Sequence, residues 1–401
     1  MKTLALKNAA VVLPDRKTAP LSVLIDEGRI VSVSDKKNLA ADQELDLTGT
    51  TLFPGFIDVH IHGAAGVDAN DTDSAGLDKV AEFLARNGVT AWLPTLVPDS
   101  EENYRRSISA IDEVRRQRVE QEQRGGFGAR VLGVHYEGPF VSEQHCGALR
   151  SPFFRNFATG EELKSLPRLE QAGAIHLMTM APEVEGGIAL IEALAKQHWV
   201  VSIGHTRASP AILDQALAAG ARHMTHFMNA MPPLHQRTPG PVGWGLLRDD
   251  VTCDVIADGI HIDPLVLELL LKLKGTAGLA LISDSIMAAG LGDGEYQIWS
   301  ETITVKDGHT SNAQGSIAGS VISMLDAVRL ILSLGASEVD VARMAATNPA
   351  RLLGIDDECG SIAEGKRADL VALDQTGRVR MTIIGGEPHP LRDPISETQI
   401  N

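Results

Sequence analysis

Short apolar runs alternate with helix-like stretches over most of this chain. Between Pro54 and about Gly354 there are eight such runs, and several of the helical stretches between them end at a glycine, a common helix stop. Eight strand–helix alternations in roughly 300 residues favour a closed (β/α)8 TIM-like barrel over a doubly wound open sheet. The predicted strands end near His62, Thr95, Glu137, Ala181, His205, Asn229, Asp258 and Asp284.

Imidazole and carboxylate side chains stand at or near the ends of five of these runs. They are His60 and His62 in GFIDVHIH, followed along the chain by Glu137, His205, His226 and Asp284. Residues two apart on a strand share a face, so His60 and His62 can bind one ion together. An isolated histidine pair is as often structural as functional. Six such side chains at strand ends that meet at one barrel mouth favour a functional role. The sequence therefore predicts a catalytic divalent-metal centre.

The two ends of the chain follow a different pattern. Residues 1–53 contain alternating runs such as LALKNAAVVL and SVLIDEGRIVSVS, with a hairpin signal at Asp26-Glu27-Gly28. After Gly354 short strand-like runs return in CGSIAEGKRADLVALD and GRVRMTIIGG. The fold class is α/β, and we predict that residues 1–53 and 355–401 form one small β-sandwich domain beside a barrel of residues 54–354.

Composition and charge exclude several classes of protein. The chain is 44% hydrophobic and 22% charged, with a net charge of −16, which disfavours nucleic acid or an anionic membrane as partner. No apolar run reaches the ~18 residues of a membrane helix, and the N-terminal segment has the pattern of strand and turn instead of a signal peptide. Three widely spaced cysteines suit a reducing cytoplasm. An anionic small molecule would need a local cationic pocket.

An ordered series of motifs identifies a family resemblance. The stretch FPGFIDVHIHGAAGVDAND is followed by EGPF, GHT, HFMNAM, RTPG, ADGIH, LISD and IAGS. This series resembles the N-acetylglucosamine-6-phosphate deacetylases of the amidohydrolase superfamily, and the similarity extends to DEGRI and GSIAEGKRADLVALD near the two ends. N-acetylgalactosamine-6-phosphate deacetylases share almost all of these motifs, so the sugar epimer stays open.

The resemblance implies a role for each matching residue. Glu137, His205 and His226 match the metal ligands, and His60 and His62 imply a second ion bridged by Glu137. The implied metal is Zn²⁺, with Fe²⁺, Co²⁺ or Mn²⁺ as alternatives. Asp284 matches the catalytic acid and base. The residues that match the substrate contacts are Ala148, Leu149, Asn229, Ala230, Arg237, Asp258, His261, Ile317, Ala318 and Gly319.

The implied substrate is an amino-sugar phosphate. Arg237 and His261 match the pair that recognises the phosphate, and in the family one of these residues reaches in from a neighbouring subunit, which implies a homodimer. Leu149 departs from the pattern, because the family usually has His or Gln there. A polar substrate contact is therefore missing or is supplied elsewhere, with His145 as a candidate.

The expected chemistry is hydrolysis of an amide. The reaction needs an activated water, a polarised carbonyl and a proton for the leaving amine. A divalent ion supplies the first two by lowering the pKa of water toward ~7 and by polarising the carbonyl, while Asp284 transfers the proton. One alternative is a cyclic-amide hydrolase, although the fourth strand, IHLMTMAPE, lacks the lysine that bridges two metals in many of them. A non-catalytic relative is disfavoured because every candidate ligand is present.

Overall fold

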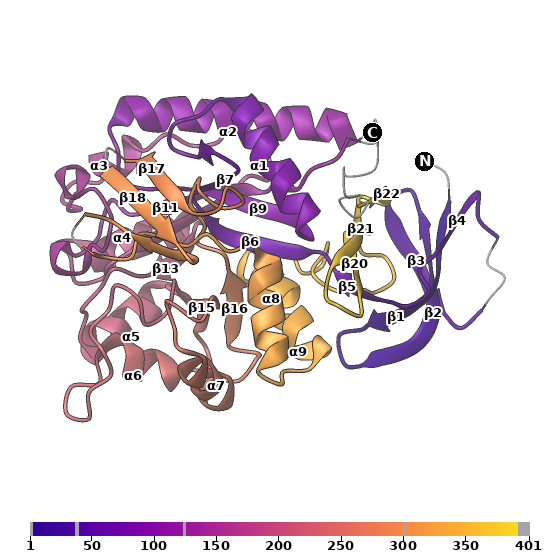
Figure 1. Cartoon of the computed structure of the whole chain (residues 1–401). Helices are drawn as coiled ribbons and strands as arrows, with labels where there is room; N and C mark the ends of the chain where they lie inside the picture. Colours follow the sequence, from indigo (N-terminus) through magenta and orange to yellow (C-terminus); the bar gives the residue numbers. More distant parts are fainter. Residues whose placement is uncertain (1–2, 37–39, 123–125, 300, 314, 392–401) are drawn as a thin grey trace.

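Eight parallel strands form the centre of the molecule (Figure 1). The computed structural model describes residues 3–36, 40–122, 126–299, 301–313 and 315–391. In chain order the barrel strands are β6 (Phe56–Ile61), β9 (Val89–Leu96), β11 (Gly133–Glu137), β12 (Ile175–Met180), β13 (Val200–Ile203), β14 (His223–Met224), β15 (Thr252–Ile256) and β16 (Leu279–Ile282). Each pairs in parallel with its neighbour, and the short β10 (Arg130–Val131) adds to β9. The predicted barrel is confirmed.

The barrel closes through hydrogen bonds between its last and first strands. The Asp284 amide donates to the carbonyl oxygen of His60 at 2.9 Å, and the His62 amide donates to that of Ser285 at 2.8 Å. These bonds lie just beyond the end of β16, so the sheet is nearly closed. Closure brings Asp284 beside the histidines of β6, although more than 220 residues separate them along the chain.

Helices cover the outside of the barrel (Figure 1). They are α1 (Ser74–Arg86), α2 (Glu101–Glu122), α3 (Glu161–Lys164), α4 (Gly187–Lys196), α5 (Pro210–Ala219), α6 (Gly240–Leu246), α7 (Pro264–Leu273), α8 (Met324–Ser333), α9 (Glu338–Ala342) and α10 (Asn348–Leu352). Side-chain caps start several of them: Asp73 accepts a hydrogen bond from the Gly76 amide, and Ser323 forms a capping box with Asp326. Among the described residues no helix is long and apolar enough to span a membrane.

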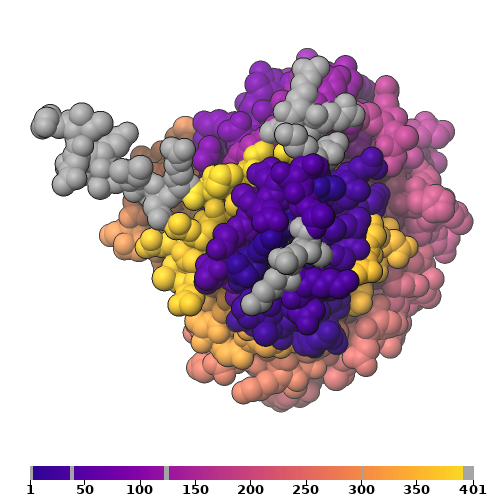
Figure 2. All heavy atoms as spheres, turned by 90° about the vertical axis from the view of Figure 1, so that its right-hand side faces the viewer, coloured from indigo at the N-terminus to yellow at the C-terminus, as the bar shows by residue number. Residues whose placement is uncertain are grey.

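The terminal segments form a separate eight-stranded sheet. Its strands are β1 (Leu4–Val12), β2 (Lys17–Asp26), β3 (Arg29–Ser34), β4 (Gln43–Asp46), β5 (Thr50–Pro54), β20 (Leu370–Asp374), β21 (Val379–Ile384) and β22 (Glu387–Pro390). β5 pairs with β20, which joins the two ends of the chain, and Figure 2 shows the indigo and yellow segments side by side. Because β1 pairs with β2, β4 and β5, the sheet bends around an apolar core of its own.

The predicted hairpin at residues 26–28 is confirmed. β2 and β3 pair antiparallel, and the two turn residues have positive φ angles, 46° at Glu27 and 75° at Gly28, as a tight hairpin turn of this hand requires. The domain limits at residues 53 and 354 stay a prediction, and residues 392–401 of the C-terminal segment lie outside the described residues.

A small antiparallel sheet interrupts the alternation after the eighth barrel strand. It consists of β17 (Gly294–Ile298), β18 (Glu301–Lys306) and β19 (His309–Ser311), and its apolar side packs on Ile286 and Ala318. This sheet was not predicted from the sequence, because its strands are short and bury few residues. A two-strand turn, β7 (Gly63–Ala64) with β8 (Val67–Asp68), similarly follows β6.

Candidate metal centre and active site

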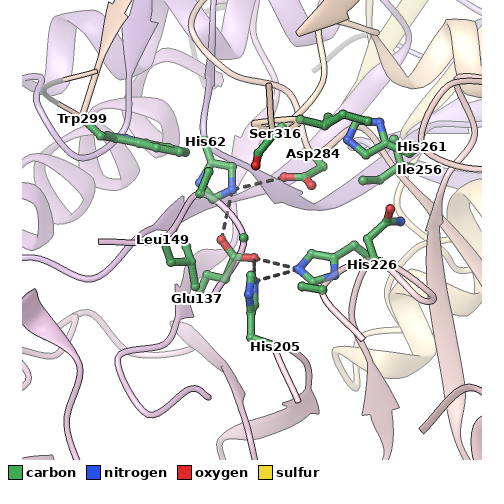
Figure 3. A pocket seen from close by; sticks show the side chains of 16 residues that line it. His62, Glu137, Leu149, His205, His226, Ile256, His261, Asp284, Trp299 and Ser316 are labelled. Carbon is green, nitrogen blue, oxygen red and sulfur yellow. Dashed lines mark hydrogen bonds and ion pairs between the residues drawn. The ribbon is translucent and has the colours of Figure 1, made fainter. Parts of the chain in front are cut away.

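Five side chains from four strands converge at the carboxyl end of the barrel, and Figure 3 shows His62, Glu137, His205 and His226 among them. Glu137 Oε1 lies 2.9 Å from His205 Nε2 and 3.0 Å from His226 Nε2, and these nitrogens are 3.0 Å apart. We call these three residues the tight group. His60 and His62 form a loose group with Glu137, in which the two Nε2 atoms are 3.3 Å apart and lie 3.4 and 3.3 Å from the Glu137 oxygens. The structure thus brings together all five predicted metal ligands.

A hydrogen bond behind the His205 ring determines which nitrogen carries its proton. His205 Nδ1 lies 3.0 Å from the carbonyl oxygen of His145, which can only accept, so Nδ1 is the donor. Burial lowers the pKa of His205, and the neutral ring directs an unprotonated Nε2 at the Glu137 oxygen. Two lone pairs that face each other at 2.9 Å repel unless a cation lies between them. Nitrogen and carboxylate donors in this arrangement fit a divalent transition metal.

The buried carboxylates make this space attractive to positive charge. Burial lowers the pKa of His62, but hydrogen bonds to Asp284 and Glu137 outweigh that effect and raise it to about 10. The pKa of His226 is raised to about 9 because the bond to Glu137 outweighs burial in the same way. Burial raises the pKa of Glu137 and of Asp284, yet the neighbouring histidines lower both below their usual values. The two carboxylates therefore stay ionised in the interior.

Asp284 lies against the loose group. Its Oδ1 is 3.2 Å from His62 Nε2 and 3.5 Å from His60 Nε2. The side chain also lines the cavity that opens at the barrel mouth. An ionised carboxylate that lines the cavity next to candidate metal ligands is placed to accept a proton.

Three of these residues have strained backbones. The φ angles of His205, His226 and Asp284 are +47°, +27° and +48°, in a region of backbone conformation that residues other than glycine rarely adopt. Each of these residues lies two positions after the last residue of its strand, so the strained turn directly follows the strand. Such conformations are destabilising by about 1–3 kcal/mol each and persist where surrounding bonds hold them. This clustering is typical of functional sites.

A second layer of buried polar residues supports both groups from below. Thr225 Oγ1 lies 2.8 Å from His60 Nδ1 and 3.3 Å from Asp254 Oδ2. Asp254 also accepts from the His226 amide and lies 2.8 Å from His223 Nε2. Thr225, Asp254 and His223 were not predicted from the sequence as part of the site. The signal was present, because polar residues two apart in HMTHF and a carboxylate within TCDVI are unusual inside an apolar barrel.

A cavity of about 340 Å³ opens onto the two ligand groups. The predicted site residues that line it are His62, Glu137, Ala148, Leu149, His205, His226, Asn229, Ala230, His261, Asp284, Ile317 and Gly319. The lining residues that were not predicted are Gly147, Ile256, Trp299 and Ser316. Of the remaining predicted residues, His60 and Ala318 are buried close by, Asp258 supports His261, and Arg237 is exposed and does not line this cavity.

The polar end of the cavity offers donors for a substrate. Asn229 Nδ2 is buried and has no hydrogen-bond partner among the described residues, so an occupant can accept from it. His261 Nδ1 lies 2.7 Å from Asp258 Oδ2, which leaves the other ring nitrogen for the cavity. Burial raises the pKa of Asp258, but the bond from His261 outweighs that effect and keeps it low.

The departure at Leu149 has a structural answer. Leu149 packs with Val97, Val141 and Trp299, so an apolar contact takes the place of the expected polar one. His145, the candidate replacement, does not line the cavity and contributes its backbone carbonyl to His205. The contact between the His145 carbonyl and His205 could not be predicted from a local sequence pattern, because every residue has a backbone carbonyl.

Comparison with known proteins gives the family. The model of the amidohydrolase family matches residues 51–388. The N-acetylglucosamine-6-phosphate deacetylase of Bacillus subtilis is 35% identical over 388 residues, which cover 96% of each chain. The chain belongs to the amidohydrolase family, in its N-acetylglucosamine-6-phosphate deacetylase branch. The resemblance found in the sequence motifs is confirmed.

Other relatives extend this result. The N-acetylgalactosamine-6-phosphate deacetylase of Escherichia coli O157:H7 is 37% identical over 337 residues, covering 84% of this chain and 87% of that one. The crystal structure of the N-acetylglucosamine-6-phosphate deacetylase from Pasteurella multocida superimposes with a TM-score of 0.88 at 27% identity, covering 97% and 100% of the two chains. A mutant of the Mycobacterium smegmatis enzyme in complex with N-acetyl-D-glucosamine 6-phosphate gives 0.86 at 30% identity, covering 97% and 99%.

Proposed function

We propose that this chain hydrolyses the N-acetyl amide of N-acetyl-D-glucosamine 6-phosphate, releasing D-glucosamine 6-phosphate and acetate, in amino-sugar catabolism. The observation that carries the proposal is the meeting of four histidine nitrogens on the carboxylate of Glu137 at the barrel mouth, open to a cavity of about 340 Å³. The B. subtilis relative has this activity in its name, and the M. smegmatis structure contains this sugar phosphate.

The donor set supports a zinc enzyme. Glu137, His205 and His226 would hold one ion, and His60 and His62 a second, with Glu137 shared between them. We propose Zn²⁺, while the same donors also accept Fe²⁺, Co²⁺ or Mn²⁺. What such an ion supplies is Lewis acidity toward water and toward the amide carbonyl.

Asp284 is the proposed general base and acid. As water adds to the amide carbon, the carboxylate of Asp284 takes its proton, and the same carboxyl then gives that proton to the nitrogen as the C–N bond breaks. The hydrogen bond from His205 to the His145 carbonyl keeps the His205 ring in one orientation throughout. The protein thus moves one proton from water to the leaving amine.

The far end of the cavity supports recognition of the sugar and its phosphate. Asn229 and Ala230 would contact the sugar, with Ile317, Ala318 and Gly319 covering it. His261, held by Asp258, would donate to the phosphate. Arg237 does not line the cavity of its own chain, so we propose that it reaches the phosphate in the neighbouring subunit of a homodimer.

An exposed apolar surface supports the homodimer. Leu265, Leu269 and Leu273 recur every four residues on α7, with exposed fractions of 74%, 45% and 57%. Leu247, which is 85% exposed, lies beside them. Its position follows from Lys274 Nζ, which donates to the carbonyl oxygens of Gly245 and Arg248 and thereby ties α6 to α7. Contiguous exposed leucines of this kind mark association surfaces. Leu269→Glu should halve the mass in sedimentation, while an unchanged mass would exclude this face.

The chemistry of the chain supports a place in the cytoplasm. All three cysteines, Cys146, Cys253 and Cys359, are free thiols, and two of them are buried. Free thiols persist in a reducing compartment. The partners we propose are the small sugar phosphate and a second copy of the chain.

The test of the function is a comparison of two substrates. Initial rates of acetate release should be measured on the 6-phosphates of N-acetylglucosamine and N-acetylgalactosamine, with metal counted in the same preparation. We expect the glucosamine epimer to react faster, and the chelator-treated protein to lose activity on both. The similarity to the E. coli enzyme makes N-acetylgalactosamine 6-phosphate the second candidate substrate. A faster rate on this epimer than on the glucosamine epimer would favour it. Full activity without metal would contradict the proposal.

A further inference from the structure

We propose that Leu149 and Trp299 form the binding surface for the acyl group of the substrate and restrict the enzyme to short N-acyl chains. We call this pair the Leu149–Trp299 wall. The inference rests on the proposed deacetylation and adds which part of the substrate this side of the cavity recognises, namely a small alkyl group attached to the amide carbonyl.

The wall stands directly beside the ligand groups. The Trp299 ring meets the His62 ring edge-on, with centroids 5.2 Å apart and planes at 82°. Leu149 is 8% exposed and packs against Trp299 and the buried Val97 and Val141. Both wall residues line the 340 Å³ cavity. A group bound over the metal ligands therefore touches the wall.

The loop that carries Leu149 is fastened to the tight group. The carbonyl oxygen of His145 accepts the hydrogen bond from His205 Nδ1, and the His205 carbonyl oxygen accepts one from the Ser142 amide at 3.0 Å. Gly147 has a φ of +58° and lies beside His205, where an added Cβ would be in van der Waals contact with the ring at 3.6 Å. The position of Leu149 relative to the reacting carbonyl is thus set by the same bonds that orient a metal ligand.

The geometry of the amide assigns the acyl group to this side. In a secondary amide the two carbon substituents lie trans across the C–N bond, so the sugar and the acyl chain point in opposite directions. Figure 3 shows Leu149 and Trp299 on one side of the Glu137 and Asp284 carboxylates and His261 on the other. With the sugar phosphate at the His261 end and the carbonyl over the carboxylates, the acyl chain faces the wall.

The chemistry of the wall matches an alkyl group. The Leu149 side chain is entirely hydrocarbon, and the indole of Trp299 adds a large, mostly apolar surface. A methyl group placed there is removed from water against hydrocarbon and aromatic side-chain surface. Steric selection follows as well, since one methylene too many in such a pocket changes kcat/KM by about 10- to 200-fold.

A second cavity lies immediately behind the wall. It has a volume of about 390 Å³, and it shares Ala148, Leu149 and Trp299 with the reaction cavity. Its other lining residues include the apolar Ile298 and Ile303. Shortening a wall side chain should join the two spaces and make room for a longer acyl chain.

The experiment compares N-acetyl, N-propionyl and N-butyryl glucosamine 6-phosphate as substrates of the metal-loaded enzyme. The readout is the ratio of kcat/KM for the longer acyl group to that for acetyl, measured by release of the free amine. We expect the wild type to prefer acetyl. Leu149→Ala should raise the propionyl-to-acetyl ratio by about 10-fold or more, because the missing carbons open the second cavity. Trp299→Leu should shift the ratio in the same direction.

Ile256→Ala is the matched control. It removes the same number of carbons from the same cavity, at the side away from the wall (Figure 3), and should leave the ratio within about threefold. Unchanged ratios in both wall variants, or an equal rise in Ile256→Ala, would overturn the proposal. If Leu149→Ala does not fold, the propionyl-to-acetyl ratio of Trp299→Leu alone tests the proposal. A wild type that releases no acetate would instead overturn the deacetylase function itself.

Discussion

The two ligand groups that share Glu137 differ in spacing and in their neighbours. The atoms of the tight group lie 2.9–3.0 Å apart, whereas the loose group spans 3.3–3.4 Å. A backbone carbonyl orients His205 in the tight group, and a threonine hydroxyl orients His60 in the loose one. Only the loose group contacts Asp284. The difference supports the proposal that the tight group mainly holds an ion, whereas the loose group joins ion binding to proton transfer.

The largest expected effect separates the two groups directly. His205→Ala removes a ligand of the tight group, so turnover should fall by more than about 10³-fold and the metal of this group should be lost. His62→Ala should lower the metal count by up to one ion and leave measurable turnover. Elemental analysis and initial rates on the same preparations measure both quantities. Equal losses in the two variants would show that the groups act as one unit.

The next prediction concerns proton transfer at the loose group. Asp284→Asn preserves size but removes the base, so turnover should fall by about 10²-fold or more. The metal of the tight group should remain, because Asp284 lies against His60 and His62 and not against His205. The measurement is again rate and metal content together. Normal turnover in this variant would exclude Asp284 as the general base.

A smaller effect is expected from the buried layer below the groups. Asp254→Asn weakens the support of the His226 amide and, through Thr225, of His60, so metal affinity should fall by about 10- to 100-fold. Thr225→Val is the matched variant, since it removes the hydroxyl that contacts His60 Nδ1 and Asp254 but leaves the bond from the His226 amide to Asp254, so it should weaken the loose group alone. Competition with a chelator of known affinity measures both. Identical effects would contradict separate support for the two groups.

The smallest effect lies outside both groups. Arg237→Ala should raise KM for the phosphorylated sugar by about 10-fold, because it removes a charge-assisted hydrogen bond, and should leave kcat nearly unchanged. The KM for the unphosphorylated sugar should not change. Arg207→Ala, which removes another exposed arginine, is the control and should change neither value. Equal changes for both sugars would show that Arg237 does not recognise phosphate.

Local rules were sufficient to predict the barrel and its principal polar residues. The two-residue period of a strand places His60 and His62 on one face, and parallel strands in a barrel direct their carboxyl ends to the same rim. These rules apply to each strand by itself, so Glu137, His205 and Asp284 could be assigned before their partners were known. In the structure Glu137 Oε1 lies 2.9 Å from His205 Nε2, and Asp284 Oδ1 lies 3.2 Å from His62 Nε2.

Contacts between distant segments could not be predicted in this way. Trp299 reaches the cavity from an inserted antiparallel sheet, and its position depends on how that sheet packs on Ile286 and Ala318. The position of Arg237 outside its own cavity depends on the path of residues 232–239, which no periodic pattern describes. Asp254 meets Thr225 only because β14 and β15 pair in one particular register.

The sequence by itself determined the fold class and the kinds of side chain at the barrel mouth, because apolar periodicity and strand ends are local properties. Only the tertiary structure decided the division into a tight and a loose group, the support from the His145 carbonyl and the apolar wall beside them. Those features arise from ring orientation, a backbone group common to all residues and packing across more than 100 residues of chain. Their energies depend on distances of a few tenths of an ångström, which are fixed by the assembled barrel and not by any single segment.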